Sequence, residues 1–169
     1  MQSAPGGVIP AYVALGANLG EPVETLRSAA VALGRRPGVE LLAGSPIYRT
    51  RPIGPPGQPD YANAVARVGT ALAPEALLAV LHAVEAEFGR VRGVRWGPRT
   101  LDLDLIWYAG EERADGRLIL PHPRAHEREF VLRPLADLDP DLGLRGRPVR
   151  DWLAGLAPQG VEPAGVALM

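Results

Sequence analysis

The sequence predicts an α+β fold from the order of its apolar patterns. Short apolar or alternating segments, typical of strands, are separated by two amphipathic segments, typical of helices. The expected strands span 11–16, 39–48, 60–69 and 101–108, and the expected helices span 21–36 and 74–88. The resulting order, β-α-β-β-α-β, is the ferredoxin-like arrangement, a mainly antiparallel sheet with helices packed on one face.

The first strand and helix are predicted from local signals. The apolar run 11–16 ends in the segment Gly16 to Gly20, whose glycine spacing indicates a turn into a helix and differs from a dinucleotide-binding fingerprint. Helix 21–36 has Glu24 in its first turn and Arg35-Arg36 at its end, which complements the helix dipole.

In the middle of the chain, the sequence predicts two further strands joined by a long loop. Loop 49–59, between strands 39–48 and 60–69, is rich in Pro and Gly, and loops of this length often serve as functional lids. Helix 74–88 begins with Pro74, a residue favoured in the first helical turn.

The C-terminal third gives weaker signals. We expect a polar turn at 109–116, a short strand at 118–120 and a short helix at 149–156, followed by a mobile tail at 157–169. His122 and His126 have a zinc-like spacing only on a helix, and Pro123 excludes helical backbone at His122.

Composition indicates one soluble globular domain, 1–169. Hydrophobic residues make up 47% of the chain and charged residues 22%. There is no Cys, no recognisable signal peptide and no apolar run of membrane-spanning length, so we expect a cytoplasmic protein that binds no membrane. The net charge of −1 argues against general nucleic-acid binding, and nothing indicates an obligate protein partner.

All 18 basic residues are Arg. The absence of Lys excludes a Walker-A lysine, a protein-kinase strand lysine and a Schiff base. If the chain binds ATP, arginines and a metal ion must bind the phosphates.

The strand at 101–108 carries the clearest chemical signal. Leu101, Leu103 and Leu105 alternate with Asp102 and Asp104, so both carboxylates share the face opposite the leucines. At roughly 6.6 Å apart they repel by about 2.5 kcal/mol in an effective dielectric of about 20. A divalent cation such as Mg²⁺ removes this repulsion. The alternative is a solvated face of an edge strand, where aspartates oppose unwanted strand pairing.

A basic loop precedes these aspartates. Arg90, Arg92, Arg95 and Arg99 occur without an acidic residue among them, in a segment with Gly and Pro that indicates a loop. Guanidinium groups match pairs of phosphate oxygens. Loop and strand together predict a site for a polyphosphate and a metal ion, although solvated surface arginines are the common alternative.

Asn63 stands where the long loop enters the sheet. Its amide could pair with the edge of a heterocycle, or it could make a plain structural hydrogen bond, and spacing alone leaves both open.

The segment Arg95-Trp-Gly-Pro-Arg-Thr-Leu-Asp-Leu-Asp104 resembles the signature of the hydroxymethyl-dihydropterin pyrophosphokinase family. Further segments, Tyr48 to Asn63 and the Pro-His-Pro-Arg-x-His-Glu-Arg-x-Phe-Val-Leu-x-Pro-Leu pattern from Pro121, are similar to family motifs in the family's order. The resemblance covers about 11–156 and implies the same α+β core with additional C-terminal elements. It also implies pyrophosphoryl transfer from ATP to a pterin alcohol, giving the pterin diphosphate and AMP.

The resemblance assigns roles by matching position. Asp102 and Asp104 match the ligands of two Mg²⁺ ions, and with Arg92 and Arg99 they form the expected catalytic group. The expected ATP ligands are Glu85, Arg90, Arg92, Arg99, Arg117, His122 and Arg128. The expected pterin ligands are Thr50, Ile53, Gly54, Tyr61, Asn63, Trp96 and Phe130.

Two departures from the family pattern leave details open. The loop between Arg92 and Trp96 is one residue shorter than in the form compared, so the phosphate ligand could be Arg90, Arg92 or Arg95. Pro123 replaces an aromatic residue of some members, on the adenine side.

Three other functions fit parts of the pattern. An RNA-binding module of this fold would need an aromatic sheet signature that is absent from the sequence. A regulatory ligand-binding domain would not need two aspartates beside an arginine loop. A nucleotidyltransferase could use the aspartates and would release pyrophosphate instead of AMP.

Overall fold

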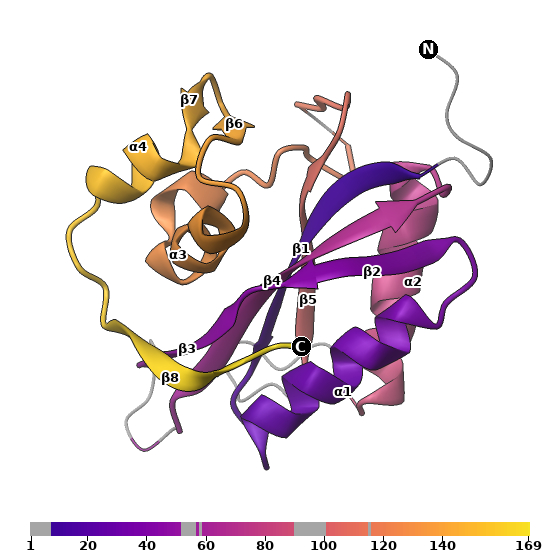
Figure 1. Cartoon of the computed structure of the whole chain (residues 1–169). Coiled ribbons are helices and arrows are strands. Elements are labelled where there is room, and N and C mark those ends of the chain that lie inside the picture. Colours follow the sequence, from indigo (N-terminus) through magenta and orange to yellow (C-terminus); the bar gives the residue numbers. More distant parts are fainter. Residues whose placement is uncertain (1–7, 52–56, 58, 90–100, 115) are drawn as a thin grey trace.

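The computed structural model describes residues 8–51, 57, 59–89, 101–114 and 116–169. A six-stranded sheet forms its centre, with the strand order β5-β1-β4-β3-β8 and with β2 also paired to β4 (Figure 1). The strands are β1 (Ile9–Ala17), β2 (Val39–Gly44), β3 (Pro46–Thr50), β4 (Tyr61–Thr70), β5 (Asp102–Tyr108) and β8 (Val161–Ala167). The recorded pairings in this sheet are antiparallel, which confirms the predicted α+β, ferredoxin-like core.

Helices α1 (Pro22–Gly34) and α2 (Pro74–Glu87) pack on one face of the sheet, as predicted (Figure 1). Their apolar stripes meet alternate residues of the strands. The shared core contains Leu26 and Leu33 of α1, Leu77 and Leu81 of α2, and Leu103 of β5, each at most 2% exposed. Burial of these side chains determines which residues of each strand point to the opposite face of the sheet, away from this core.

The opposite face carries the C-terminal elements, the additions to the core that the family resemblance implied. Helix α3 (Glu129–Leu138) packs there on Tyr12 of β1, Val65 of β4 and Ile106 of β5. It is joined by the 3₁₀ turn η1 (Ala125–Glu127), the hairpin β6 (Gly143–Leu144) and β7 (Arg147–Pro148), and helix α4 (Val149–Ala154).

The sequence did not predict α3, and its composition explains why. Pro134 lies inside the helix, where proline ordinarily disfavours helical backbone. Tertiary contacts outweigh this cost, because Val131, Leu132 and Leu135 are each at most 3% exposed in the second core.

The predicted strand 39–48 is divided by Ser45. This buried residue donates its N–H to the Val65 carbonyl, and its Oγ accepts the Val65 N–H at 2.9 Å. The chain can thus change direction between β2 and β3 without leaving buried polar groups unpaired.

Two predictions for the C-terminal part were wrong. Residues 157–169 were expected to be a mobile tail, but β8 pairs with β3, and the Leu168 N–H bonds the Ser45 carbonyl at 3.0 Å. Residues 118–120 form no strand, only a single bridge between Arg113 and Leu120. Within the described residues, no helix combines the length and apolar character needed to cross a membrane.

Candidate active site

A row of four facing residues crosses the sheet on the α3 side. Asp102 of β5 lies opposite Gly16 of β1, Gly16 opposite Asn63 of β4, and Asn63 opposite Tyr48 of β3. Directly opposed residues of antiparallel strands share a face, so these side chains are on one surface. The backbones that carry Asp102 and Asn63 are about two strand spacings, roughly 9.6 Å, apart, and the floor between them, at Gly16, has no side chain of its own.

The aspartates stand at the β5 edge of this surface. Asp102 and Asp104 are half-buried, whereas Leu101, Leu103 and Leu105 beside them are at most 3% exposed in the α1/α2 core. The predicted alternation is therefore confirmed. It ends at a bulge, where Val13 faces Leu105 and Tyr12 faces Trp107, leaving Ile106 unpaired in register.

Glu85 lies behind the aspartates on the helix side of the sheet. It is 2% exposed, and its Oε2 accepts the N–H of Leu103 at 2.8 Å. This bond holds the backbone between Asp102 and Asp104. Glu85 was predicted as an ATP ligand; the bond that the structure shows is the one to the backbone of β5, on the side of the sheet opposite the carboxylates.

His122 adjoins the carboxylates. Its N–H donates to the Ile106 carbonyl at 2.9 Å, which attaches the segment after residue 120 to β5. Burial lowers the pKa of His122 from 6.5 to about 4, assisted by the positive charges of Arg128 and Arg124 and opposed by the negative charge of Asp102. Since Nδ1 accepts the Arg124 N–H at 3.2 Å, the neutral ring carries its proton on Nε2 and can donate it to an oxygen anion.

Arg128 and Phe130 form the side of the surface next to α3. The Arg128 Cζ lies 5.6 Å from the centroid of the Phe130 ring, within the range of a cation–π contact. Phe130 packs against the second core but stays partly exposed, so one part of the ring remains available. Arg117, also expected near the nucleotide, is exposed on the segment before Leu120.

Asn63 and Thr50 form the opposite side. Both are buried, and the Asn63 Nδ2 donates to the Thr50 Oγ1 at 2.7 Å. Tyr61, half-buried at the start of β4, faces Thr50 across the strands. The structure thus brings three of the predicted pterin residues together on one surface.

The other predicted site residues lie outside the described residues. They are Ile53 and Gly54 on the pterin side, and Arg90, Arg92, Trp96 and Arg99 in the arginine loop, together with Arg95.

Three polar residues near this surface escaped sequence reasoning. Asn18 is 1% exposed after β1, and its Nδ2 donates to the Pro59 carbonyl at 3.3 Å, tying the turn to the end of the long loop. An Asn directly after a buried strand was the available signal. Glu129 and Gln159 contact each other over 30 positions of sequence, a distance at which no local pattern reports contact.

Fold and site together define an α+β protein of ferredoxin-like topology with two carboxylates, a neutral His, an Arg and a buried amide on one face of the sheet. A family model described as 7,8-dihydro-6-hydroxymethylpterin-pyrophosphokinase matches residues 12–140. The chain belongs to this family, as the resemblance in its sequence predicted.

Individual relatives agree. The chain is 50% identical over 153 residues to a 2-amino-4-hydroxy-6-hydroxymethyldihydropteridine pyrophosphokinase of Pseudomonas aeruginosa, covering 89% of this chain and 94% of the relative. It is 45% identical over 152 residues to the protein of that name from Methylorubrum extorquens, covering 90% and 96%.

The fold also matches solved structures. One is the wild-type HPPK-DHPS of Plasmodium falciparum, with a TM-score of 0.68 at 12% identity. The match covers 87% of this chain and 41% of the solved one, so this chain spans under half of that protein's length. At this identity the likeness concerns the fold alone.

Proposed function

We propose that the chain transfers a pyrophosphoryl group from ATP to the hydroxymethyl group of 6-hydroxymethyl-7,8-dihydropterin, giving the pterin diphosphate and AMP in folate biosynthesis. The protein is a pyrophosphokinase by family. One observation carries the assignment of the site: Asp102 and Asn63 stand on one sheet face, either side of the bare floor at Gly16. A flat heterocycle on the Asn63 side and a polyphosphate on the Asp102 side could then meet above the floor.

The donor set at β5 fits Mg²⁺. Asp102 and Asp104, which share one face of β5, would supply the protein ligands; among the described residues, no cluster of three or more His, Cys, Asp or Glu side chains suits a metal ion. Mg²⁺ favours this arrangement, because it commonly takes one or two carboxylates and completes its shell with water and substrate phosphate oxygens. When bound, the ion neutralises phosphate charge and polarises the phosphorus under attack. We propose two such ions.

The remaining polar groups bind and orient. His122 would donate Nε2–H to a phosphate oxygen, and Arg128 would neutralise another. The arginines of the preceding loop, Arg92 and Arg99 foremost, would bind the triphosphate, with Arg90 and Arg117 as further ligands. Phosphoryl transfer asks little covalent chemistry of a protein, so positioning and charge neutralisation supply most of the rate.

The pterin would lie between Asn63 and Phe130. The amide of Asn63 pairs with the polar edge of the ring system, and the open part of Phe130 stacks on its face. Thr50 holds the amide through its bond to Nδ2. Tyr61, Ile53, Gly54 and Trp96 would complete the pocket. Both substrates are small molecules, and we propose that the protein acts in the cytoplasm.

A product assay tests the proposal. Purified protein is incubated with ATP, Mg²⁺ and 6-hydroxymethyl-7,8-dihydropterin, and the mixture is chromatographed, with a reaction lacking pterin as the control. Pterin-dependent formation of AMP and pterin diphosphate is the expected result. Release of pyrophosphate in place of AMP would instead indicate nucleotidyl transfer.

A further inference from the structure

The first residue of α3 is joined to the C-terminal segment by a reciprocal pair of hydrogen bonds. The Glu129 N–H donates to the Gln159 Oε1 at 3.0 Å, and the Gln159 N–H donates to the Glu129 Oε1 at 2.8 Å. The Gln159 Nε2 also donates to the Glu127 carbonyl at 3.0 Å. We call this arrangement the Glu129–Gln159 clamp.

The clamp does what a local cap does at most helices. The first N–H groups of a helix have no partner within it, and the N-cap residue Arg128 provides no side-chain hydrogen bond. Gln159 supplies an acceptor from 30 residues further along the chain. The carboxylate of Glu129, in a residue only 4% exposed, is held on its other side by Arg133, whose Nη2 donates to Oε2 at 2.6 Å.

The clamp holds the backbone at Glu129, and a proposed ligand lies on each side of this residue in the sequence. Arg128 precedes Glu129 and Phe130 follows it, and the guanidinium of Arg128 already lies over the Phe130 ring. A shift of the Glu129 backbone would therefore move the phosphate-binding group and the pterin-stacking ring together.

The same C-terminal segment supports the opposite side of the site. Directly after Gln159 and Gly160, β8 begins, and Val161 pairs with Thr50 of β3, the residue that bonds Asn63. In Figure 1, β8 runs along β3 at the edge of the sheet. The beginning of β8 is at a distance from α1 and α2. One segment thus contacts both elements that flank the pterin side.

We propose that Gln159 is a positioning residue for Arg128 and Phe130, and that residues 157–168 form part of the frame of the binding site. The proposal rests on the proposed function for the ligands it names. The segment lies beyond residues 12–140, the part of the chain that matches the family model.

The clamp itself is tested without substrate, by amide hydrogen exchange of the full chain. Gln159→Met keeps the length of the side chain but removes its acceptor and donor. We expect the exchange of the Glu129 and Gln159 amides to become at least several-fold faster, since both bonds depend on the pair. Unchanged exchange at both amides would overturn the clamp, and this result does not depend on the reaction.

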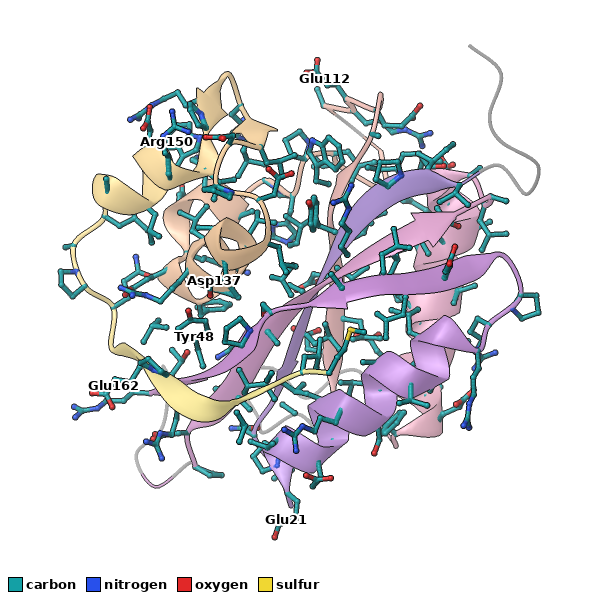
Figure 2. The ribbon with its side chains drawn as sticks, viewed as in Figure 1. Glu21, Tyr48, Glu112, Asp137, Arg150 and Glu162 are labelled. Carbon is teal, nitrogen blue, oxygen red and sulfur yellow. The ribbon has the colours of Figure 1, made fainter. Side chains whose placement is uncertain are left out.

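The positioning role is tested by kinetics below the unfolding temperature. In Gln159→Met we expect the KM values for ATP and pterin to rise roughly three- to tenfold, the effect of losing one or two ordinary hydrogen bonds. The matched control is Glu162→Met, three residues along the same segment, whose side chain is exposed and lies away from the clamp (Figure 2). It should keep both KM values.

The outcomes separate the two proposals. A lower unfolding temperature in Gln159→Met with unchanged KM values would mean that the clamp only stabilises the fold, and would overturn the positioning role. Wild-type protein that forms no pterin-dependent AMP would refute the proposed function. In that case, loss of exchange protection in the Arg128 to Phe130 segment would still support the positioning role, and its retention would refute it.

Discussion

The two faces of β5 differ in what holds their side chains. On the helix side, Leu103 and Leu105 are at most 3% exposed and pack among residues of α1 and α2. On the other side, Asp102 and Asp104 are half-buried beside a floor that Gly16 leaves bare. Neighbouring residues in sequence therefore belong to the core on one face and to the proposed binding site on the other.

This difference shows how one sheet can present charged side chains on one face and keep an apolar core on the other. Among the described residues, α3 packs on Tyr12, Val65 and Ile106, whereas Gly16 and Asp102 remain partly exposed. The C-terminal end of α3 is attached to the sheet by hydrogen bonds: Tyr12 donates to Asp139 at 3.0 Å, and Tyr48 donates to Asp137 (Figure 2). Burial, together with these bonds, raises the pKa of Tyr12 and of Tyr48 to about 12, so both remain donors at neutral pH.

The largest expected effect is on turnover, from the site face. Asp102→Ala or Asp104→Ala removes a proposed metal ligand, and the transition-state stabilisation at stake, several kcal/mol, corresponds to a loss on the order of 1,000-fold in kcat. The unfolding free energy should stay close to wild type, because neither side chain belongs to the core. Steady-state rates in Mg²⁺ provide the measurement, and near wild-type turnover in either variant would refute the metal assignment.

The reverse result, a loss of stability with little loss of turnover, is expected at Leu105, the residue after Asp104. Leu105→Ala leaves a cavity against the α1/α2 core and should lower the unfolding free energy by about 2–5 kcal/mol. Its kcat, measured where the variant is fully folded, should stay within a few-fold of wild type. Denaturant unfolding monitored by circular dichroism measures the first quantity. A large kinetic defect in folded protein would show that the two faces are not separate.

The predictability of the two faces also differed. The helix face could be predicted because its signal is periodic and local: leucines every second residue in β5 and at helical spacing in α2 were sufficient. On the site face, the aspartates and Asn63 were predicted by their chemistry and by family resemblance. Their alignment across Gly16 depends on strand register, which sequence order alone does not reveal.

The C-terminal third could not be predicted well for a physical reason. Helix α3 contains Pro134, and β8 contains Pro163 and Gly165, so local propensity opposes both elements. Long-range contacts decide their structure instead, such as the pairing of β8 with β3 and the clamp between Glu129 and Gln159. Such contacts leave no periodic trace in the sequence.

A smaller, selective effect should come from Asn63→Ala. The variant loses the proposed pairing with the pterin edge, and we expect the Kd for pterin to rise by roughly 5- to 30-fold, about 1–2 kcal/mol, with little change for ATP. Titration of pterin fluorescence and of a nucleotide analogue gives the two values. Thr50→Val is the control for the support of the amide, since it removes only the Oγ1 acceptor. An equal loss of both affinities would indicate a structural role for Asn63.

Gly16→Ala probes the bare floor itself. An added Cβ would lie 3.2 Å from the Asn63 Oδ1, a tight contact with the group that is proposed to bind the pterin. We expect the Kd for pterin to rise only about two- to fivefold, while stability stays within about 1 kcal/mol because alanine suits strand backbone. The same fluorescence titration measures it, with Ala14→Gly, on the same face of β1, as a comparison in the opposite sense. Tighter pterin binding would contradict an open floor at this position.

The last effect concerns the pH dependence of stability. The folded pKa of His122 is about 4, against an ordinary value of 6.5, so between these pH values the unfolded chain binds more protons than the folded chain. The unfolding free energy contributed by His122 is therefore full above pH 6.5 and is lost as the pH falls towards 4. In His122→Asn, the unfolding free energy should change less steeply with pH in this range, and the reduction in slope should correspond to less than one bound proton. Urea unfolding at pH 7, 5.5 and 4.5 measures this slope.

The same residue links stability to the ligand. A phosphate at Nε2 favours the charged ring, so ATP should raise the pKa of His122 and its binding should take up protons between pH 4 and 6.5. Nuclear magnetic resonance titration of the ring with and without ATP detects the shift directly. An unchanged pKa with ATP bound would place the nucleotide away from His122 and would confine the phosphate side of the site to Asp102, Asp104 and the arginines.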